Sequence, residues 1–398
     1  MLERFWRALP WDGLGWHGTS DSDLLEMRLW AARAWRRRYP APLRPLLRGA
    51  DRAGWALAAF GRTWRFARAL RLRLPATARL YRDCLMSGGD PLDVHVWREL
   101  HGSRHPLPAR AVALVFSRLG DPAGHALLAD KLALAERLSD LGLASPALRA
   151  VFRRGGVADP ELLTGAESGA GLFLKPRHGS GGRGAFALTR IDGVWRMDGK
   201  AAPLPSVLAR IGRLIEADDL LVQERVMAAG DLADLASDGR APVLRLVTAC
   251  APGEAPFLHS ALLMIARPGH SPHHFLEGMI HAPVDPAAAR LAGGRALGEP
   301  RRTLDRLGPE GPWLAGRPVP GFSDAVAAAL RAMAAVPPLS LVHWDVILTP
   351  SGPVMLEGNS AGNWILASLP GVYGLDAGPL TPTLAQWMSA PAPQRTGG

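Results

Sequence analysis

The chain has 398 residues, of which 48% are hydrophobic and 21% are charged. This length exceeds that of most single domains, so it predicts a globular protein of two or three lobes with a large core. No apolar run reaches the roughly eighteen residues of a membrane-spanning helix, and no signal-peptide pattern is present, which predicts a cytoplasmic protein. The two cysteines, Cys84 and Cys250, provide neither a disulfide framework nor a metal-binding spacing.

The N-terminal region, residues 1–105, is predicted to be basic and mainly helical. Much of the formal net charge of +10 lies there, in arginine runs threaded with tryptophans. A solvated helical subdomain with buried tryptophans is the first interpretation; contact with an anionic membrane, peripheral to the inner membrane, is the alternative, and no nucleic acid partner is expected. The residues concerned are Arg33, Arg36, Arg37, Arg38, Arg62, Arg65, Arg68, Arg71 and Arg73, with Trp30, Trp35, Trp55 and Trp64.

The middle of the chain, residues 106–388, is predicted to form an α+β domain. Residues 124–138 indicate one amphipathic helix, and from residue 171 extended segments dominate in a pattern typical of antiparallel sheets. Strands are predicted at 172–176, 185–191, 220–226, 243–250, 257–267 and 340–348, and helices at 203–216 and 321–335. Residues 389–398 are rich in proline and glycine and are predicted to be a disordered tail.

A glycine-rich stretch, FLKPRHGSGGRGAF, contains the pattern G-x-G-x-x-G from Gly179 to Gly184. A dinucleotide-binding fold needs a helix after these glycines, but here a second strand follows, with a hairpin turn at Asp192 and Gly193. A strand, a glycine loop and a strand make a flap whose backbone N–H groups can close over a triphosphate. A surface turn without a ligand is the alternative.

Lysine is scarce in this chain, because only three of the 46 basic residues are lysines. A lysine retained where arginine is the default cation indicates a site that needs a compact ammonium group. Lys175, beside the glycine loop, and Lys131, upstream of it, are therefore candidate phosphate ligands, whereas Lys200 lies in a turn-like surface sequence.

The stretch LVHWDVILTPSGPVMLEGNS, residues 341–360, predicts a β-hairpin with polar groups inside apolar strands. A hairpin centred on Ser351 places Asp345 opposite Glu357, with Asn359 on the same face and His343 opposite Asn359. Two opposed carboxylates need a cation between them, and such oxygen ligands suit Mg²⁺. His343 is a candidate substrate-facing or catalytic residue. An exposed acidic hairpin is the alternative.

The ordered set of these motifs resembles the ATP-grasp family. The set comprises Lys131, Lys175 with the glycine hairpin, the segment Gln223-Glu224-Arg225-Val226, Arg245 on a strand, Asp345, and Glu357-Gly358-Asn359. The Trp-Asp and Glu-Gly-Asn-Ser details resemble the sugar-transfer-associated branch, which is related to α-L-glutamate ligases. The resemblance extends over about residues 110–385 and implies two α+β lobes that grip ATP.

The resemblance also implies roles for single residues. Lys131 and Lys175 would hold the α- and β-phosphates, and Asp231 would hold the ribose hydroxyls. The flap would contain Gly179, Ser180, Gly181 and Gly182, and the adenine hinge Gln223, Glu224 and Val226. Two Mg²⁺ ions would be bound by Asp345, Glu357 and Asn359. Arg245 would neutralise the γ-phosphate or an acyl phosphate.

These implications predict an ATP- and Mg²⁺-dependent ligase that joins a small-molecule carboxylate to an amine through an acyl phosphate, in bacterial cell-surface polysaccharide synthesis. One alternative is an ATP-dependent phosphotransferase acting on a sugar. Another is a noncatalytic, nucleotide-binding factor at the membrane. The histidine-rich stretch with His270, His273, His274 and His281 lacks zinc-site spacing and is expected to form a substrate-facing or solvent loop.

Overall fold

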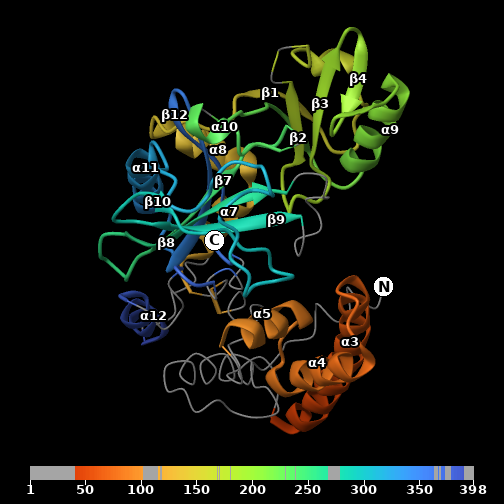
Figure 1. Ribbon diagram of the computed structural model, residues 1–398. Coiled ribbons are helices and arrows are strands. Elements are labelled where there is room, and N and C mark those ends of the chain that lie inside the picture. The colour runs from red at the N-terminus through yellow and green to blue at the C-terminus, as the bar shows by residue number, and fades with distance from the viewer. Residues whose placement is uncertain are drawn as a thin grey trace.

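The computed structural model describes residues 41–101, 115–116, 119–167, 169, 171–179, 181–228, 230–237, 239–267, 278–362, 366, 369–372 and 378–389. Predictions for Ser180, for His270, His273 and His274, and for residues 1–40, 102–105 and 390–398 lie outside this set. Figure 1 shows a group of N-terminal helices below two β-sheets that carry their own helices. Among the described residues no helix is long and apolar enough to cross a membrane.

Proline and glycine set the limits of the N-terminal helices. Pro45 and Pro75 lie in the first turns of α3 and α4, where a missing N–H costs nothing, and Pro91 opens α5. Gly88 ends α4 in the left-handed conformation. The elements are the short η1 (Ala41–Leu43), α3 (Arg44–Ala69), α4 (Leu74–Ser87) and α5 (Pro91–His101).

The smaller sheet is antiparallel with strand order β1-β6-β2-β3-β4-β5. Helix α9 covers one face through Val207, Ile211 and Ile215. Because side chains alternate along a strand, Phe173, Lys175 and Gln223 lie on the other face. The elements are β1 (Leu148–Phe152), η2 (Pro160–Leu163), β2 (Leu172–Pro176), β3 (Phe186–Ile191), β4 (Val194–Met197), β5 (Lys200–Ala201), α9 (Leu204–Ile215) and β6 (Leu220–Glu224).

The larger sheet is also antiparallel, with order β10-β9-β8-β7-β11-β12. Its outer face forms the main core with α7, α8 and α11, and Trp344 and Val346 are fully buried there. The elements are α7 (Pro122–Ala129), α8 (Lys131–Asp140), α10 (Gly230–Ala233), β7 (Val243–Ala249), β8 (Phe257–Ala266), β9 (Met279–Asp285), β10 (Arg290–Leu291), α11 (Phe322–Ala335), β11 (Leu341–Thr349), β12 (Gly352–Asn359) and α12 (Leu380–Ser389).

The N-terminal helices are attached to the inner face of the larger sheet. Val96 of α5 packs with Leu262 and Met264 of β8 in a small apolar cluster. His95 Nε2 lies 3.1 Å from the carbonyl oxygen of Gly298, which adds a polar contact to the same junction. Helix α5 therefore joins the helical layer to the sheet.

The α+β class with antiparallel sheets and the six predicted strands are confirmed, within one or two residues at each end. The prediction of one helix over residues 124–138 is wrong, because Asp130 is extended and separates α7 from α8. The Asp130 carboxylate accepts hydrogen bonds from Leu132 N and Ala133 N, so it starts a new helix. Ser389, assigned to the tail, is the last residue of α12.

Candidate functional site

A cavity of about 380 Å³ lies between the inner faces of the two sheets. Apolar side chains from both sheets, among them Phe173, Met264 and Ile347, form much of its wall. It is also lined by the predicted site residues Lys131, Lys175, Gly179, Gly182, Gln223, Glu224, Val226, Asp345 and Glu357. Apolar walls with a few convergent polar groups are the usual form of a small-molecule site.

The β11–β12 hairpin pairs Asp345 with Glu357 and His343 with Asn359, which confirms the predicted register. The position of the turn and an irregularity in β12, which the sequence did not predict, together produce this register. Its turn lies at Pro350 and Ser351, and a bulge at Leu356 then adds one unpaired residue to β12. Without the bulge, Asp345 would face Leu356. The bulge therefore brings the two carboxylates together.

The bulge also supplies a partner for Lys175. Lys175 Nζ donates a hydrogen bond to Leu356 O at 3.2 Å, which connects the two sheets. The Lys175 residue is only 8% exposed. This burial lowers the pKa of Lys175 to about 8, and the nearby Glu357 carboxylate opposes the shift in part. A cationic group in such surroundings interacts strongly with an anion in the cavity.

Charged side chains from three neighbouring strands form a row at the cavity. Arg245 pairs with Asp345, which in turn pairs with Glu357. Arg245 donates from Nε to Asp345 Oδ1 and from Nη2 to Oδ2, both at 2.8 Å. Arg245 is thus the cation that the opposed carboxylates require. A carboxylate offers about four lone-pair positions, so Asp345 keeps acceptor capacity toward the cavity.

The glycine in Glu357-Gly358-Asn359 has a packing role. Gly358 lies opposite Trp344, and a Cβ at residue 358 would come within 2.7 Å of the Trp344 ring. The Trp344 indole is held in place because its Nε1 donates to Thr248 Oγ1 at 3.0 Å. Asn359 Nδ2 donates to Glu357 Oε1 at 3.1 Å. The Trp-Asp and Glu-Gly-Asn motifs therefore form one packed unit that positions the carboxylates.

His343 and His281 are buried on the inner face of the larger sheet, near Arg245. Burial lowers the pKa of His281 to about 3 and holds the pKa of His343 well below its usual range, so both rings are neutral at neutral pH. The backbone at Gly362 lies against the His343 ring, and a Cβ there would come within 2.0 Å of Nε2. His343 is therefore covered by the chain and does not line the cavity.

The glycine-rich loop joins the end of β2 to the start of β3, which confirms the strand-loop-strand prediction. Gly181 and Gly182 have φ values of +69° and +65°, a conformation that favours glycine. Lys131 contacts the base of this loop, because its Nζ donates to Gly179 O at 2.8 Å and its backbone N to Arg177 O at 3.1 Å. Lys131 and Lys175 therefore reach the cavity from different elements.

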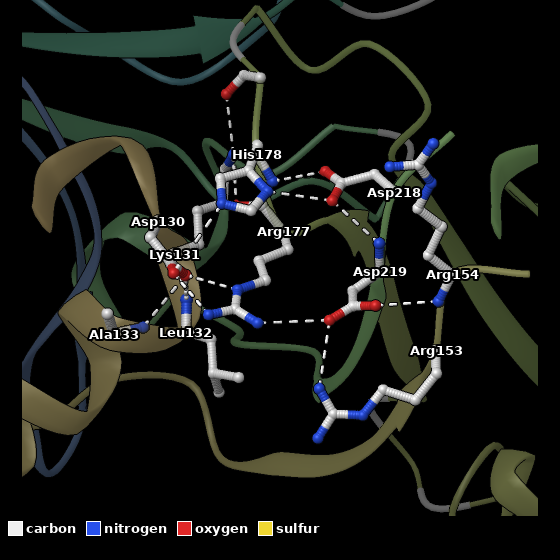
Figure 2. Close-up of polar contacts among 11 residues, drawn as sticks. Asp130, Lys131, Leu132, Ala133, Arg153, Arg154, Arg177, His178, Asp218 and Asp219 are labelled. Carbon is white, nitrogen blue, oxygen red and sulfur yellow. Dashed lines mark hydrogen bonds and ion pairs between the residues drawn. The ribbon is translucent and has the colours of Figure 1, made fainter. Parts of the chain in front are cut away.

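A polar cluster fixes the base of the glycine loop, and Figure 2 shows the Arg177 guanidinium between Asp130 and Asp219. Arg177 donates to the two Asp130 oxygens at 2.8 and 2.5 Å and to Asp219 Oδ2 at 3.3 Å. The Arg177 guanidinium lowers the pKa of Asp130 to about 2. Asp218 accepts from His178 N at 2.7 Å and lies 3.0 Å from its Nδ1. We call Asp130, Arg177, His178, Asp218 and Asp219 the clasp.

The predicted hinge residues lie at the end of β6, where Gln223 and Glu224 are the last two strand residues and Val226 comes just after them. The Gln223 side chain is 2% exposed, and its Nε2 lies 3.4 Å from Pro146 O. Its Oε1 is buried at the cavity with no hydrogen-bond donor among the described residues. The Glu224 carboxylate is ion-paired with Arg149 on β1. Gln223 is therefore the hinge side chain that offers an acceptor, because a buried carbonyl oxygen is costly to leave unpaired.

Some predicted residues lie elsewhere. Asp231, which the resemblance assigns to the ribose hydroxyls, lies on α10 and lines a separate hollow with Asp324 and Ser351. The chain leaves the cavity wall after Val226 and returns to it at Gly239, and Asp231 lies between these two points. A short distance from the hinge along the sequence therefore does not place a residue at the cavity. Gly181, Arg245, His343 and Asn359 also do not line the cavity, although Arg245 and Asn359 contact residues that do.

Four charged residues that the sequence analysis missed also line the cavity. They are Arg183, Asp198, Arg225 and Arg240. Arg225 follows Glu224 directly, so the hinge motif itself could have indicated it. Asp198 and Arg240 come from separate turns, and no local sequence pattern marks them. The wall thus carries five cationic and four acidic side chains, which suits an anion that is bound together with a cation.

The donor set fits a nucleotide with magnesium. Among the described residues no group of three or more histidine, cysteine, aspartate or glutamate side chains could hold a metal ion by itself. Asp345 and Glu357 offer two carboxylates to the cavity, and Mg²⁺ is commonly bound by one or two carboxylates together with substrate phosphates. The unpaired Gln223 oxygen suits the amino group of a purine base.

Comparisons with known proteins give distant similarities only. No protein-family model matches the sequence, and no curated protein matches it. The VanG D-Ala:D-Ser ligase from Enterococcus faecalis is 13% identical over 68% of this chain and 63% of its own, with a TM-score of 0.42. The D-alanine–D-alanine ligase from Bacillus anthracis, solved with ATP, is 11% identical over 68% and 66%, with a TM-score of 0.38.

An L-amino acid ligase from Bacillus licheniformis is 13% identical over 68% of this chain and 52% of its own, with a TM-score of 0.35. The present chain spans less than two thirds of each of these three ligases.

Proposed function

We propose that this protein binds ATP with Mg²⁺ in the cavity and uses it to join a small-molecule carboxylate to an amine. The observation that supports this most is the convergence of Lys175, Asp345 and Glu357 on one cavity. Three different elements bring these side chains together. A buried ammonium group beside two carboxylates suits a metal-bound polyphosphate.

The proposed roles follow from the position of each group. Lys131 and Lys175 neutralise the phosphates nearest the glycine loop, and the loop backbone, with Gly179 and Gly182, covers them. Gln223 and the backbone at Val226 receive the adenine base. Ser180 and Gly181 complete the flap in this proposal.

Asp345 and Glu357 hold magnesium at the carboxylate end of the cavity. Asn359 orients Glu357 through its hydrogen bond to Oε1. Arg245 holds Asp345 in place through two hydrogen bonds and balances its negative charge from behind the cavity wall. When bound, magnesium lowers the repulsion between the phosphate oxygens and an incoming nucleophile.

In the proposed reaction a substrate carboxylate oxygen attacks the γ-phosphorus, and ADP leaves. The amine nitrogen of the second substrate then attacks the resulting acyl carbon, and phosphate leaves as the amine loses a proton. The protein contributes positioning and charge neutralisation, which are the main needs of phosphoryl transfer. We place this reaction in bacterial cell-surface polysaccharide synthesis on the sequence resemblance to the sugar-transfer-associated ATP-grasp branch.

Calorimetric titration of ATP into the full chain, with and without Mg²⁺, tests the proposal. We expect binding that Mg²⁺ strengthens, followed by release of both ADP and phosphate when suitable carboxylates and amines are supplied. A phosphorylated product without free phosphate would instead identify a phosphotransferase acting on a sugar. Binding without turnover across such screens would identify a noncatalytic nucleotide-binding factor. A folded protein that binds no nucleotide would contradict the whole proposal.

The clasp provides a test of how Lys131 is positioned. Asp130→Asn keeps a good N-cap for α8 but removes the charge that holds Arg177. We expect this variant to weaken ATP binding by about tenfold, because the charge-assisted pair between residue 130 and Arg177 is lost. Thermal stability should change little, because asparagine keeps the cap of α8. Asp130→Ala should lose the cap as well and reduce the free energy of unfolding by about 1 kcal/mol. Calorimetry and thermal unfolding measure the two effects.

The matched control for the clasp is Arg190→Gln. Arg190, on β3 of the smaller sheet, forms an exposed pair with Glu167 at 2.7 Å, and exposed pairs contribute little. This variant should retain both affinity and stability. If Asp130→Asn binds ATP as tightly as the wild type, the clasp does not position Lys131.

A further inference from the structure

Helix α3 has two apolar faces, and among the described residues one of them packs in the core of the helical layer while most of the other is exposed. On its inner face Trp55, Ala59 and Phe66 pack in the cluster formed with α4 and α5. On the opposite face Leu46, Leu57, Phe60 and Trp64 are 73%, 71%, 57% and 48% exposed. Their spacing places these four side chains in one stripe along a helix of 26 residues. We call this stripe the outer face of α3.

The surroundings of the outer face are strongly basic. Between Arg44 and Ser87 the sequence has ten arginines and two aspartates, and Asp83 is already paired with Arg82 and Arg98. Five exposed arginines cluster near Trp64 and the start of α4, where Leu74 is also exposed. None of the five forms an ion pair with another described residue. They are Arg65, Arg68, Arg71, Arg73 and Arg79.

We propose that the outer face of α3 lies on an anionic lipid bilayer. Such a surface accepts the apolar stripe at the boundary between head groups and acyl chains, and its phosphates attract the adjacent arginines. Tryptophan is favoured at this depth because its ring is apolar and its N–H is polar. A second copy of the chain fits less well, since it would bring two arginine clusters together.

The attachment of α5 gives this docking a consequence for the enzyme site. Val96 of α5 packs against Leu262 and Met264, and Met264 also lines the cavity. A bilayer contact at α3 would therefore hold the larger sheet and the cavity at the lipid surface, and not the N-terminal helices alone. This inference goes beyond the proposed reaction and does not depend on it.

Flotation of the full chain with lipid vesicles tests the inference. We expect binding to vesicles of equal parts phosphatidylcholine and phosphatidylglycerol, little binding to phosphatidylcholine alone, and a loss of binding as salt is raised. Leu57→Ser and Trp64→Ser should each weaken partitioning by roughly tenfold, because each removes a large apolar side chain from the lipid boundary. Arg65→Gln and Arg68→Gln should each weaken it about fivefold.

Trp313→Ser is the matched control, because Trp313 is 55% exposed on a different part of the chain. It should partition like the wild type, and all variants should keep wild-type ATP binding and circular dichroism. Equal binding to neutral and anionic vesicles would overturn the proposal, as would variants of α3 that bind like Trp313→Ser. A dimer that Leu57→Ser dissociates, without vesicle binding, would show that a second copy covers this face. A monomer that binds no vesicles would leave a protein partner as its occupant and also overturn the proposal.

Discussion

Glu357→Gln is expected to remove most of the increase in ATP affinity that Mg²⁺ provides, and to lower metal-dependent turnover by about a hundredfold, or about 3 kcal/mol in the barrier. The substitution keeps the size of the side chain but removes one of the two carboxylates that line the cavity. The neutral amide is a weaker ligand for a hard divalent cation. Calorimetric titration with and without Mg²⁺ measures the effect on binding, and ADP release measures turnover.

Thermal unfolding distinguishes this result from a folding defect. Glu357 lies directly opposite Asp345, so removal of its charge relieves a repulsion between like charges but also removes an attraction to Lys175, and thermal stability should change little. Glu254→Gln, at an exposed turn between β7 and β8, is the control and should bind MgATP normally. Unchanged metal dependence in Glu357→Gln would mean that the metal site lies elsewhere.

Lys175→Met is expected to weaken ATP binding roughly tenfold to a hundredfold, the range for loss of a hydrogen bond to a charged group. Methionine fits the buried path of the side chain without its charge. Lys175→Arg should also bind poorly, because a site that leaves the residue 8% exposed has little room for a larger planar group. Lys200→Met, on the exposed edge of the smaller sheet, is the control and should bind like the wild type.

The lowered pKa of Lys175 adds a pH dependence to this prediction. Because that pKa is about 8 in the ligand-free protein, the ammonium group loses its proton as pH rises through this value. Nucleotide binding then requires uptake of a proton, so wild-type affinity should fall above pH 8. Lys175→Met should show a smaller pH dependence in the same titrations. Equal slopes for the two proteins would show that Lys175 does not contact the bound anion.

The sequence predicted correctly those features that depend on interactions between residues close together in the chain. Alternation of side chains along a strand predicted that Asp345 and Glu357 share a face, and the scarcity of lysine singled out Lys131 and Lys175. The turn at Asp192 and Gly193 was also predicted correctly, because both residues adopt positive φ in a two-residue hairpin turn.

Local sequence patterns did not predict features that depend on residues far away in the chain. The segment 124–138 has helical periodicity, yet Asp130 interrupts it, because its carboxylate caps α8 and is also held by Arg177, 47 residues away. Asp231 follows the hinge at a suitable spacing, but the fold of α10 carries it into another hollow. The bulge at Leu356 left no sign in the sequence, although it sets the final register of the hairpin.

The sequence by itself determined the class of fold, the strand-loop-strand flap and the identity of the lysines and carboxylates at the cavity. The tertiary structure alone decided which groups these residues meet: Arg245 against Asp345, Leu356 O against Lys175, and the burial of His343. The physical reason is that propensity and side-chain periodicity act over a few residues. Ion pairing, burial and the resulting pKa shifts depend on which distant strands become neighbours.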